Sequence, residues 1–142
     1  MIRCLIAILC FTFTVCLAAL AQDEPVMTSA SFPKYPPLAC QGRVEGIVKL
    51  SFTLPARSDE PTNVEVVSGH PMLNTSAVEN LKTWRFDNKY TVDRKYESTF
   101  KYRLSGREVS GSATKKLTVS LESFHQVEIV TDVYEETASY QH

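Results

Sequence analysis

The chain has 142 residues, of which 15 are basic and 16 acidic, for a formal net charge of −1. A chain of this length holds one domain with short flanking segments. Its near-neutral charge gives no reason to expect nucleic acid or an anionic membrane surface as the partner, because both are bound by clustered positive charge.

The first 21 residues have the layout of a secretory signal peptide. Arg3 supplies a positive charge, a long apolar run follows, and Ala19-Leu20-Ala21 forms a small-x-small cleavage site before polar residues. We therefore expect export and removal of residues 1–21. An uncleaved inner-membrane anchor is the alternative, since the apolar run nearly reaches membrane-spanning length. Cleavage would leave Cys40 without a cysteine partner, so no intrachain disulfide is expected.

Residues 22–34 are predicted to form an extended and weakly ordered leader, because they show little apolar periodicity and contain Pro25 and Pro33. Residues 38–43 are long enough for one or two helical turns, with Leu38 and Ala39 expected to point inward. The leader and this short turn would bring the chain to its first strand.

Residues 44–54 give the clearest strand pattern in the chain. Apolar residues or glycine recur at every second position, with Ile47 as the exception, and this is the period of a half-buried strand. Residues 62–68 alternate in the same way. The intervening residues 55–61 are rich in turn-forming types, so the two strands are predicted to form an antiparallel hairpin.

A change of period after the second strand predicts a helix. Its apolar stripe falls at spacings of four, four and three residues and consists of Leu73, Ala77, Leu81 and Trp84. Two starts fit the sequence, with either Asn74 as the capping residue or Ser76 and Glu79 as a capping box. Gly69, just before the helix, is expected to adopt a positive φ in a turn.

Residues 96–104 alternate once more and predict a third antiparallel strand, after a polar loop over 87–94. A Gly/Ser-rich connector over 105–114 follows, then one longer or two shorter strands within 115–131 and a solvated tail over 132–142. The predicted fold class is therefore α+β. It comprises a three-stranded antiparallel sheet, one or two helices packed on one face, and a C-terminal β extension.

No constellation of residues predicts catalysis. His70 and His125 are far apart in the sequence and show no metal-ligand or nucleophile–base spacing. No Gly-rich phosphate loop or Gly-x-Ser-x-Gly element occurs, and Cys40 is expected to be a buried or merely free thiol. We therefore predict a binding protein rather than an enzyme, with no catalytic residue, metal, cofactor or small-molecule substrate.

Residues 35–104 resemble the C-terminal domain of TonB, the periplasmic energy transducer. The resemblance rests on the Tyr35-Pro36 opening, Gly46-x-Val48 in the first strand, a second strand ending in Ser-Gly, Leu73 with Ala77, and Trp84-Arg85-Phe86 before the last strand. It implies a periplasmic location and a three-stranded antiparallel sheet with two helices on one face. The periodicities described above agree with that fold.

The resemblance further implies that the domain binds the TonB box, an extended peptide of an outer-membrane TonB-dependent transporter. Binding would occur by β-strand addition at the exposed edge of the last strand, beside the Tyr-Pro opening. By position, the implied partner-binding residues are Tyr35, Pro36, Glu97, Thr99, Lys101 and Arg103.

Two departures from TonB leave an alternative open. The sequence shows no long Pro-rich span, and its segment 115–131 is strand-like and able to occupy the edge that a partner would use. The alternative is a structural or self-associating domain, with a homodimer as one form, whose sheet edge is paired by the extension and which has no transporter ligand.

Overall fold

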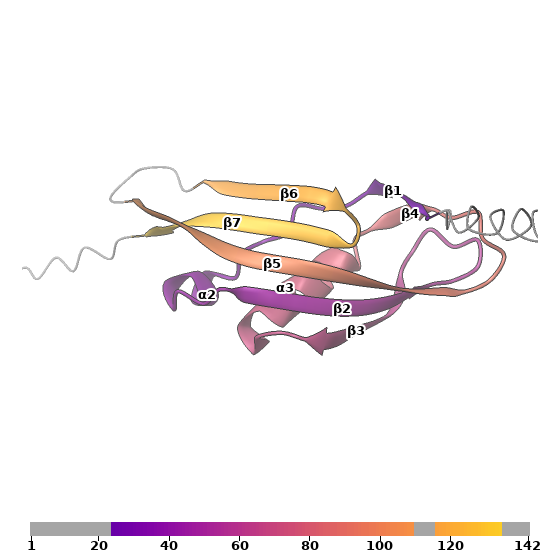
Figure 1. The fold of residues 1–142 in the computed structure, drawn as a ribbon, viewed down its shortest axis with the longest axis horizontal. Coiled ribbons are helices and arrows are strands. Elements are labelled where there is room, and N and C mark those ends of the chain that lie inside the picture. The colour runs from indigo at the N-terminus through magenta and orange to yellow at the C-terminus, as the bar shows by residue number, and fades with distance from the viewer. Residues whose placement is uncertain (1–23, 110–115, 135–142) are drawn as a thin grey trace, which may run out of the picture.

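The computed structural model describes residues 24–109 and 116–134. Over these residues the fold is α+β, with a five-stranded sheet in the order β3-β2-β5-β7-β6, a two-stranded sheet of β1 and β4, and two helices (Figure 1). The elements are β1 (Val26–Ser29), α2 (Pro37–Gln41), β2 (Gly46–Leu54), β3 (Thr62–Ser68), α3 (Pro71–Leu81), β4 (Arg85–Asp87), β5 (Arg94–Val109), β6 (Leu117–Ser123) and β7 (Gln126–Tyr134). The predicted signal peptide and most of the predicted tail lie outside the described residues. In the described part, no helix is long and apolar enough to cross a membrane.

The centre of the main sheet matches the predicted strand order. β2 pairs antiparallel with β3 on one side and with β5 on the other. The prediction of a three-stranded sheet is not confirmed, because β7 and β6 continue the sheet beyond β5. β5 is also longer than expected, since it begins at Arg94 and runs to Val109 through residues predicted as connector.

The C-terminal extension forms two strands that belong to this sheet. β7 pairs in parallel with β5, and β6 pairs antiparallel with β7. β7 also takes in residues 132–134, which were predicted as tail. Val127 and Ile129 of β7 are buried, so the extension has an apolar side of its own that is removed from water by packing against the domain.

α3 lies across one face of the sheet, behind β2 and β5 in Figure 1. Three residues of the predicted stripe, Leu73, Ala77 and Leu81, are fully buried along it. The helix starts earlier than predicted, because the Nδ1 atom of His70 accepts a hydrogen bond from the Met72 amide and Pro71 occupies the first turn. Neither of the two predicted starts is therefore correct.

A cluster of aromatic rings joins α3, the central strands and the extension. Trp84, just after α3, stacks on Phe100 of β5 with 5.6 Å between ring centroids. Phe124, in the turn between β6 and β7, meets Phe86 edge-on at 5.5 Å and Phe52 at 6.4 Å. Edge-on and offset ring pairs add to the free energy gained by burial. The extension therefore shares one core with the rest of the domain.

The leader is more ordered than its sequence predicts. β1 pairs antiparallel with β4, which fixes the leader to the segment that follows α3. α2 supplies the predicted helical turn, and its Ala39 is buried, but Leu38 is 69% exposed, contrary to prediction. In this short helix Ala39 and Cys40 form the buried pair, so the preceding side chain is turned away from the core. The described chain enters at β1 near one end of the sheet and leaves after β7 at the opposite end (Figure 1).

Candidate functional site

The edge of β5 that was predicted to be open carries a strand. β7 runs beside it in parallel, with Thr99 opposite Gln126 and Leu104 opposite Thr131. The amide of Thr99 donates to the carbonyl of His125 at 2.8 Å, so pairing begins in the turn before β7. The expectation of an open β5 edge is therefore corrected from Thr99 to Leu104, because an apolar segment of the same chain pairs with the backbone there.

The polar side chains predicted to face a partner lie along the β5–β7 pair. Lys101 and Arg103 both approach one carboxylate oxygen of Glu128 on β7, at 3.5 Å and 3.4 Å. Glu97 is exposed and Thr99 is half-buried. Of the four predicted contact residues on β5, Lys101 and Arg103 therefore lie against the extension.

Tyr35 is a core residue, not a surface residue. It is 7% exposed, its hydroxyl donates to the carbonyl of Val44 at 2.6 Å, and its ring meets Tyr102 of β5 edge-on at 5.4 Å. Burial, with a smaller contribution from the nearby carboxylate of Glu45, raises the pKa of Tyr35 to about 12. Pro36 is half-buried and caps the start of α2. The structure thus brings the Tyr-Pro opening to the inner face of β5.

Within the described residues, the outermost strands of the five-stranded sheet are β3 and β6. β3 is irregular, since its pairing with β2 shifts register twice. β6 pairs with β7 without interruption from Leu117 to Leu121, and all of β6 except the half-buried Val119 is exposed. Irregularity protects an edge from further pairing, so β6, with one register shift after Leu121, is the more regular of the two outer edges.

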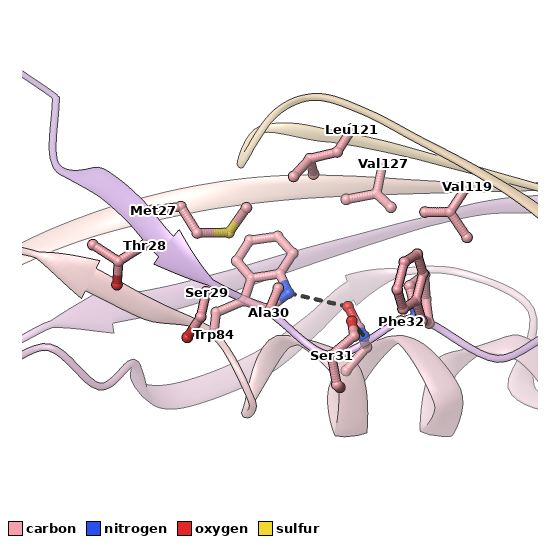
Figure 2. A pocket seen from close by; sticks show the side chains of 12 residues that line it. Met27, Thr28, Ser29, Ala30, Ser31, Phe32, Trp84, Val119, Leu121 and Val127 are labelled. Carbon is pink, nitrogen blue, oxygen red and sulfur yellow. Dashed lines mark hydrogen bonds between the residues drawn. The ribbon is translucent and has the colours of Figure 1, made fainter.

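A groove of about 350 Å³ lies between the leader and the extension (Figure 2). Residues 27–33 form one wall, Val119 and Leu121 of β6 with Val127 of β7 form the other, and Trp84 lies between them. Phe32, beside Val119 in Figure 2, is 82% exposed. The sequence did not predict this groove, because its walls come from three segments that show no shared local pattern.

Asn80 holds the leader against α3. Its Oδ1 accepts a hydrogen bond from the indole of Trp84 at 3.0 Å, and its Nδ2 donates to the carbonyl of Ser31 at 2.7 Å. The amide of Ser31 donates to the hydroxyl of Thr83 at 3.1 Å. The side-chain oxygen and nitrogen of the buried Asn80 are therefore both paired, and Ser31 in the wall of the groove is bonded through its carbonyl to α3 and through its amide to the turn after α3.

In the part of the chain that the structure describes, Cys40 and the two histidines lie apart, and of these only His125 is at the β5 edge, with its Nδ1 2.8 Å from the carbonyl of Glu97. Cys40 is buried in α2, with its thiol 3.7 Å from the carbonyl of Asp132, so burial is the one of the two expected states, buried or merely free, that the structure shows. His70 caps α3, whereas His125 lies 3.1 Å from Glu24 at the far end of the leader. Among residues 24–109 and 116–134, no three His, Cys, Asp or Glu side chains are grouped to hold a metal ion.

Comparison with known proteins finds a protein family that matches about half of the chain and a solved structure with a similar fold. Residues 31–104 match the family described as the C-terminal of the Gram-negative bacterial TonB protein. The solution NMR structure of the TonB C-terminal domain from Pseudomonas aeruginosa is similar, with a TM-score of 0.51 and 24% identity over 62% of this chain and 94% of that chain. At this identity the likeness concerns the fold alone. No curated protein matches the chain. The family match ends within β5, before β6 and β7.

Proposed function

Because the chain belongs to the TonB C-terminal family through residues 31–104, we propose that it is a periplasmic binding module of TonB-dependent transport. Its ligand is an extended peptide segment of an outer-membrane transporter, bound by β-strand addition. In that mode the backbone amides and carbonyls of a sheet edge supply affinity, and alternate side chains supply selectivity. The proposal requires no catalytic residue and no cofactor.

The acceptor strand in this proposal is β5, and the peptide takes the position that β7 holds. The supporting observation is the pairing of β7 itself, which lies on β5 as a parallel strand from Thr99 to Leu104 and beyond. An extended segment thus fits this edge in both backbone register and side-chain packing. The proposed contact residues remain Glu97, Thr99, Lys101 and Arg103, with Tyr35 and Pro36 supporting β5 from its inner face.

Lys101 and Arg103 favour a peptide with an acidic side chain. In the closed sheet both cations lie near the same carboxylate, that of Glu128. A peptide carboxylate at the equivalent position would replace this partner when β7 leaves. Cross-strand pairs of opposite charge stabilise a sheet by a few tenths of a kcal/mol to about 1 kcal/mol each, so they select among peptides and do not dominate the affinity.

β7 competes with the peptide because it is part of the same chain. A tethered segment has an effective concentration on the order of millimolar, so a peptide binds the closed domain less tightly than it would bind bare β5. A substitution that weakens β7 without touching β5 should therefore tighten peptide binding.

Glu128→Lys provides this test. It replaces two attractive pairs with repulsion from Lys101 and Arg103, and we expect the dissociation constant of a TonB-box peptide to fall by about tenfold. The measurement is a titration of residues 22–142 followed by amide shifts in NMR spectra. Glu65→Lys, on the outer strand β3, is the control with the same charge change. If the peptide causes no amide shifts along β5 in either the unaltered chain or Glu128→Lys, the proposed ligand is wrong.

A second function is favoured by the depth at which the extension is buried. Phe124, Val127 and Ile129 all lie in the common core. If β7 never leaves β5, the chain is a structural domain whose edge is closed by its own extension, with no transporter ligand. Hydrogen exchange separates the two functions. Amides along β7 that exchange only on global unfolding favour the structural domain, and amides that exchange by local opening favour the peptide-binding module.

A further inference from the structure

We propose that the outer edge of β6 is the docking site for a second copy of this chain. Two β6 strands would pair antiparallel about a two-fold axis at Val119, joining the two five-stranded sheets. This inference goes beyond the binding of a transporter peptide and does not depend on it. β6 lies outside the residues that match the TonB family, so the family's properties do not bear on it.

The backbone of β6 has the alternation that such pairing requires. The amide of Asp132 donates to the carbonyl of Lys116 at 3.2 Å, and the β6–β7 register then continues without a shift from Leu117 to Leu121. In an antiparallel pair, the residues that bond to the neighbouring strand alternate with residues that point their amide and carbonyl groups away. From Lys116 to Leu121 the even-numbered residues therefore face β7, and the odd-numbered residues Leu117, Val119 and Leu121 present their backbone groups outward; one register shift follows, between Leu121 and Ser123.

The sequence of β6 is self-complementary about Val119. In an antiparallel pair centred there, Val119 meets its own copy and Leu117 meets Leu121 of the second copy. Lys116, just before β6, then lies near Glu122 of the second copy, at the register shift after Leu121, and the symmetry repeats this pair at the other end. Opposite charges and apolar pairs placed directly across two strands stabilise the pairing. Neither Lys116 nor Glu122 forms an ion pair within the described part of the chain.

Other registers lose these matches. If the pairing shifts by one residue, amide and carbonyl groups of one copy that point away from its β7 lie opposite groups of the second copy that are already bonded to β7. The hydrogen bonds between the two β6 strands are then lost. A shift by two residues in one direction places Glu122 opposite Thr118, and in the other direction it places Lys116 opposite Ser120. Both ion pairs are then absent. The pairing centred on Val119 therefore satisfies backbone, apolar and charged groups together.

The other outer strand does not have this property. β3 carries a single charged residue, Glu65, so the strand offers no opposite charge to a second copy. Two register shifts also interrupt its pairing with β2, whereas the pairing of β6 with β7 has one shift, after Leu121, and such irregularities hinder edge-to-edge association. Association by strand pairing is therefore expected at β6.

A second copy would also cover an apolar surface beside this edge. Val119 and Leu121 line the groove of about 350 Å³ under the leader. Phe32, next to Val119 in Figure 2, is 82% exposed. A strand added to β6 extends this wall of the groove with the Val119 and Leu121 side chains of the second copy. The apolar side of the pair then lies next to the exposed ring, and burial of this surface favours association.

Charge reversal tests the proposal in residues 22–142. Lys116→Glu or Glu122→Lys alone turns both symmetric ion pairs into repulsive pairs, and we expect either to raise the dimer dissociation constant by about tenfold. The double variant restores opposite charges and should return the constant to that of the unaltered chain. Sedimentation at concentrations up to about 1 mM detects even weak association. Far-UV circular dichroism checks that each variant is folded.

Cysteine cross-linking tests the register independently of affinity. Val119→Cys places two thiols across the axis, where directly opposed residues have Cα atoms about 5.5 Å apart and can form a disulfide. Leu121→Cys is the matched control, because its two copies would be four residues apart along the strand, or about 13 Å. Mixing Leu117→Cys with Leu121→Cys should restore cross-linking.

Three outcomes would overturn the proposal. The first is a chain that stays monomeric at every concentration in sedimentation. The second is a dimer whose dissociation constant is unchanged by both single charge reversals. The third is cross-linking of Leu121→Cys that equals or exceeds that of Val119→Cys. Restoration by the double charge variant would support it, together with cross-linking of Val119→Cys but not of Leu121→Cys by itself.

Discussion

Gly69 joins β3 to α3 where the backbone has a φ of +156°. A methyl group added there would clash with the side-chain oxygen of Asn74 and lie 3.0 Å from Val48. We expect Gly69→Ala to lower the free energy of unfolding by about 2 kcal/mol. Gly106→Ala is the matched control, because its φ of +71° is also positive but nothing lies within 4 Å of the added atom. Urea unfolding compares them, and equal losses would show that the clash has no effect.

Tyr35 gives the fold a dependence on alkaline pH. Its pKa of about 12 in the folded chain lies above the value of about 10 of an exposed tyrosine. The neutral phenol therefore contributes its full stabilisation below about pH 10, and this contribution is lost as the pH rises through about 12. Between about pH 10 and pH 12, we expect the free energy of unfolding to fall less steeply in Tyr35→Phe than in the unaltered chain. Urea unfolding at several pH values measures both slopes. Identical slopes would contradict the assignment to Tyr35.

At the level of single residues, the sequence predicted packing better than it predicted contacts. Gly69 has the expected positive φ, and Trp84 and Cys40 are buried as expected. Such features depend on local backbone and polarity. The capping role of His70 and the two bonds of Asn80 depend on neighbours brought together by folding, and no spacing in the sequence reveals them.

Asn80 couples two elements that are distant in the sequence, the leader and α3. Replacing it with alanine leaves the indole of Trp84 without its acceptor and the carbonyl of Ser31 without its donor. We expect Asn80→Ala to lower the free energy of unfolding by about 2 kcal/mol, because buried polar groups lose their partners. Amides of β1 should also exchange faster with solvent.

Thr83→Val is the control for this substitution. It removes a hydroxyl that accepts from the Ser31 amide, bonds the Ser31 hydroxyl and donates to the carbonyl of Asn80. Thr83 is exposed, so water can take the place of this hydroxyl at little cost. If Thr83→Val destabilises the chain as much as Asn80→Ala, the buried pairing is not what holds the leader.

Whether an element could be predicted depended on its length and on the range of its contacts. β2, β3 and α3 show a clear period over 7–11 residues, so their positions were close to prediction. β1 and β4 have four and three residues, too few to show a period, and each is a strand because it pairs with the other. The pairing of β7 with β5 also depends on contacts between distant parts of the sequence. The alternation of apolar residues predicts a strand but does not tell which edge of the sheet that strand will pair with. The groove could not be predicted for the same reason, because folding brings its lining together from the leader, α3 and the extension.

For the whole molecule, the shared core predicts a single unfolding transition. Phe124 of the extension packs on Phe52, Phe86 and Tyr96, which belong to the family domain. We expect Phe124→Ala to lower the free energy of unfolding by about 3 kcal/mol or more. The midpoints measured by Trp84 fluorescence and by far-UV circular dichroism should move together. Two separated transitions would mean that the extension is a separate unit.

The placement of the chain's entry and exit at opposite ends of the sheet bears on mechanics. A pull between residue 24 and residue 134 would load the short β1–β4 pairing at one end, and at the other end the hydrogen bonds between β7 and β5 would be sheared together rather than unzipped one at a time. Sharing tension among many bonds makes such a sheet stiff in that direction. A tether attached at either end would therefore transmit tension through the folded domain before the domain gave way.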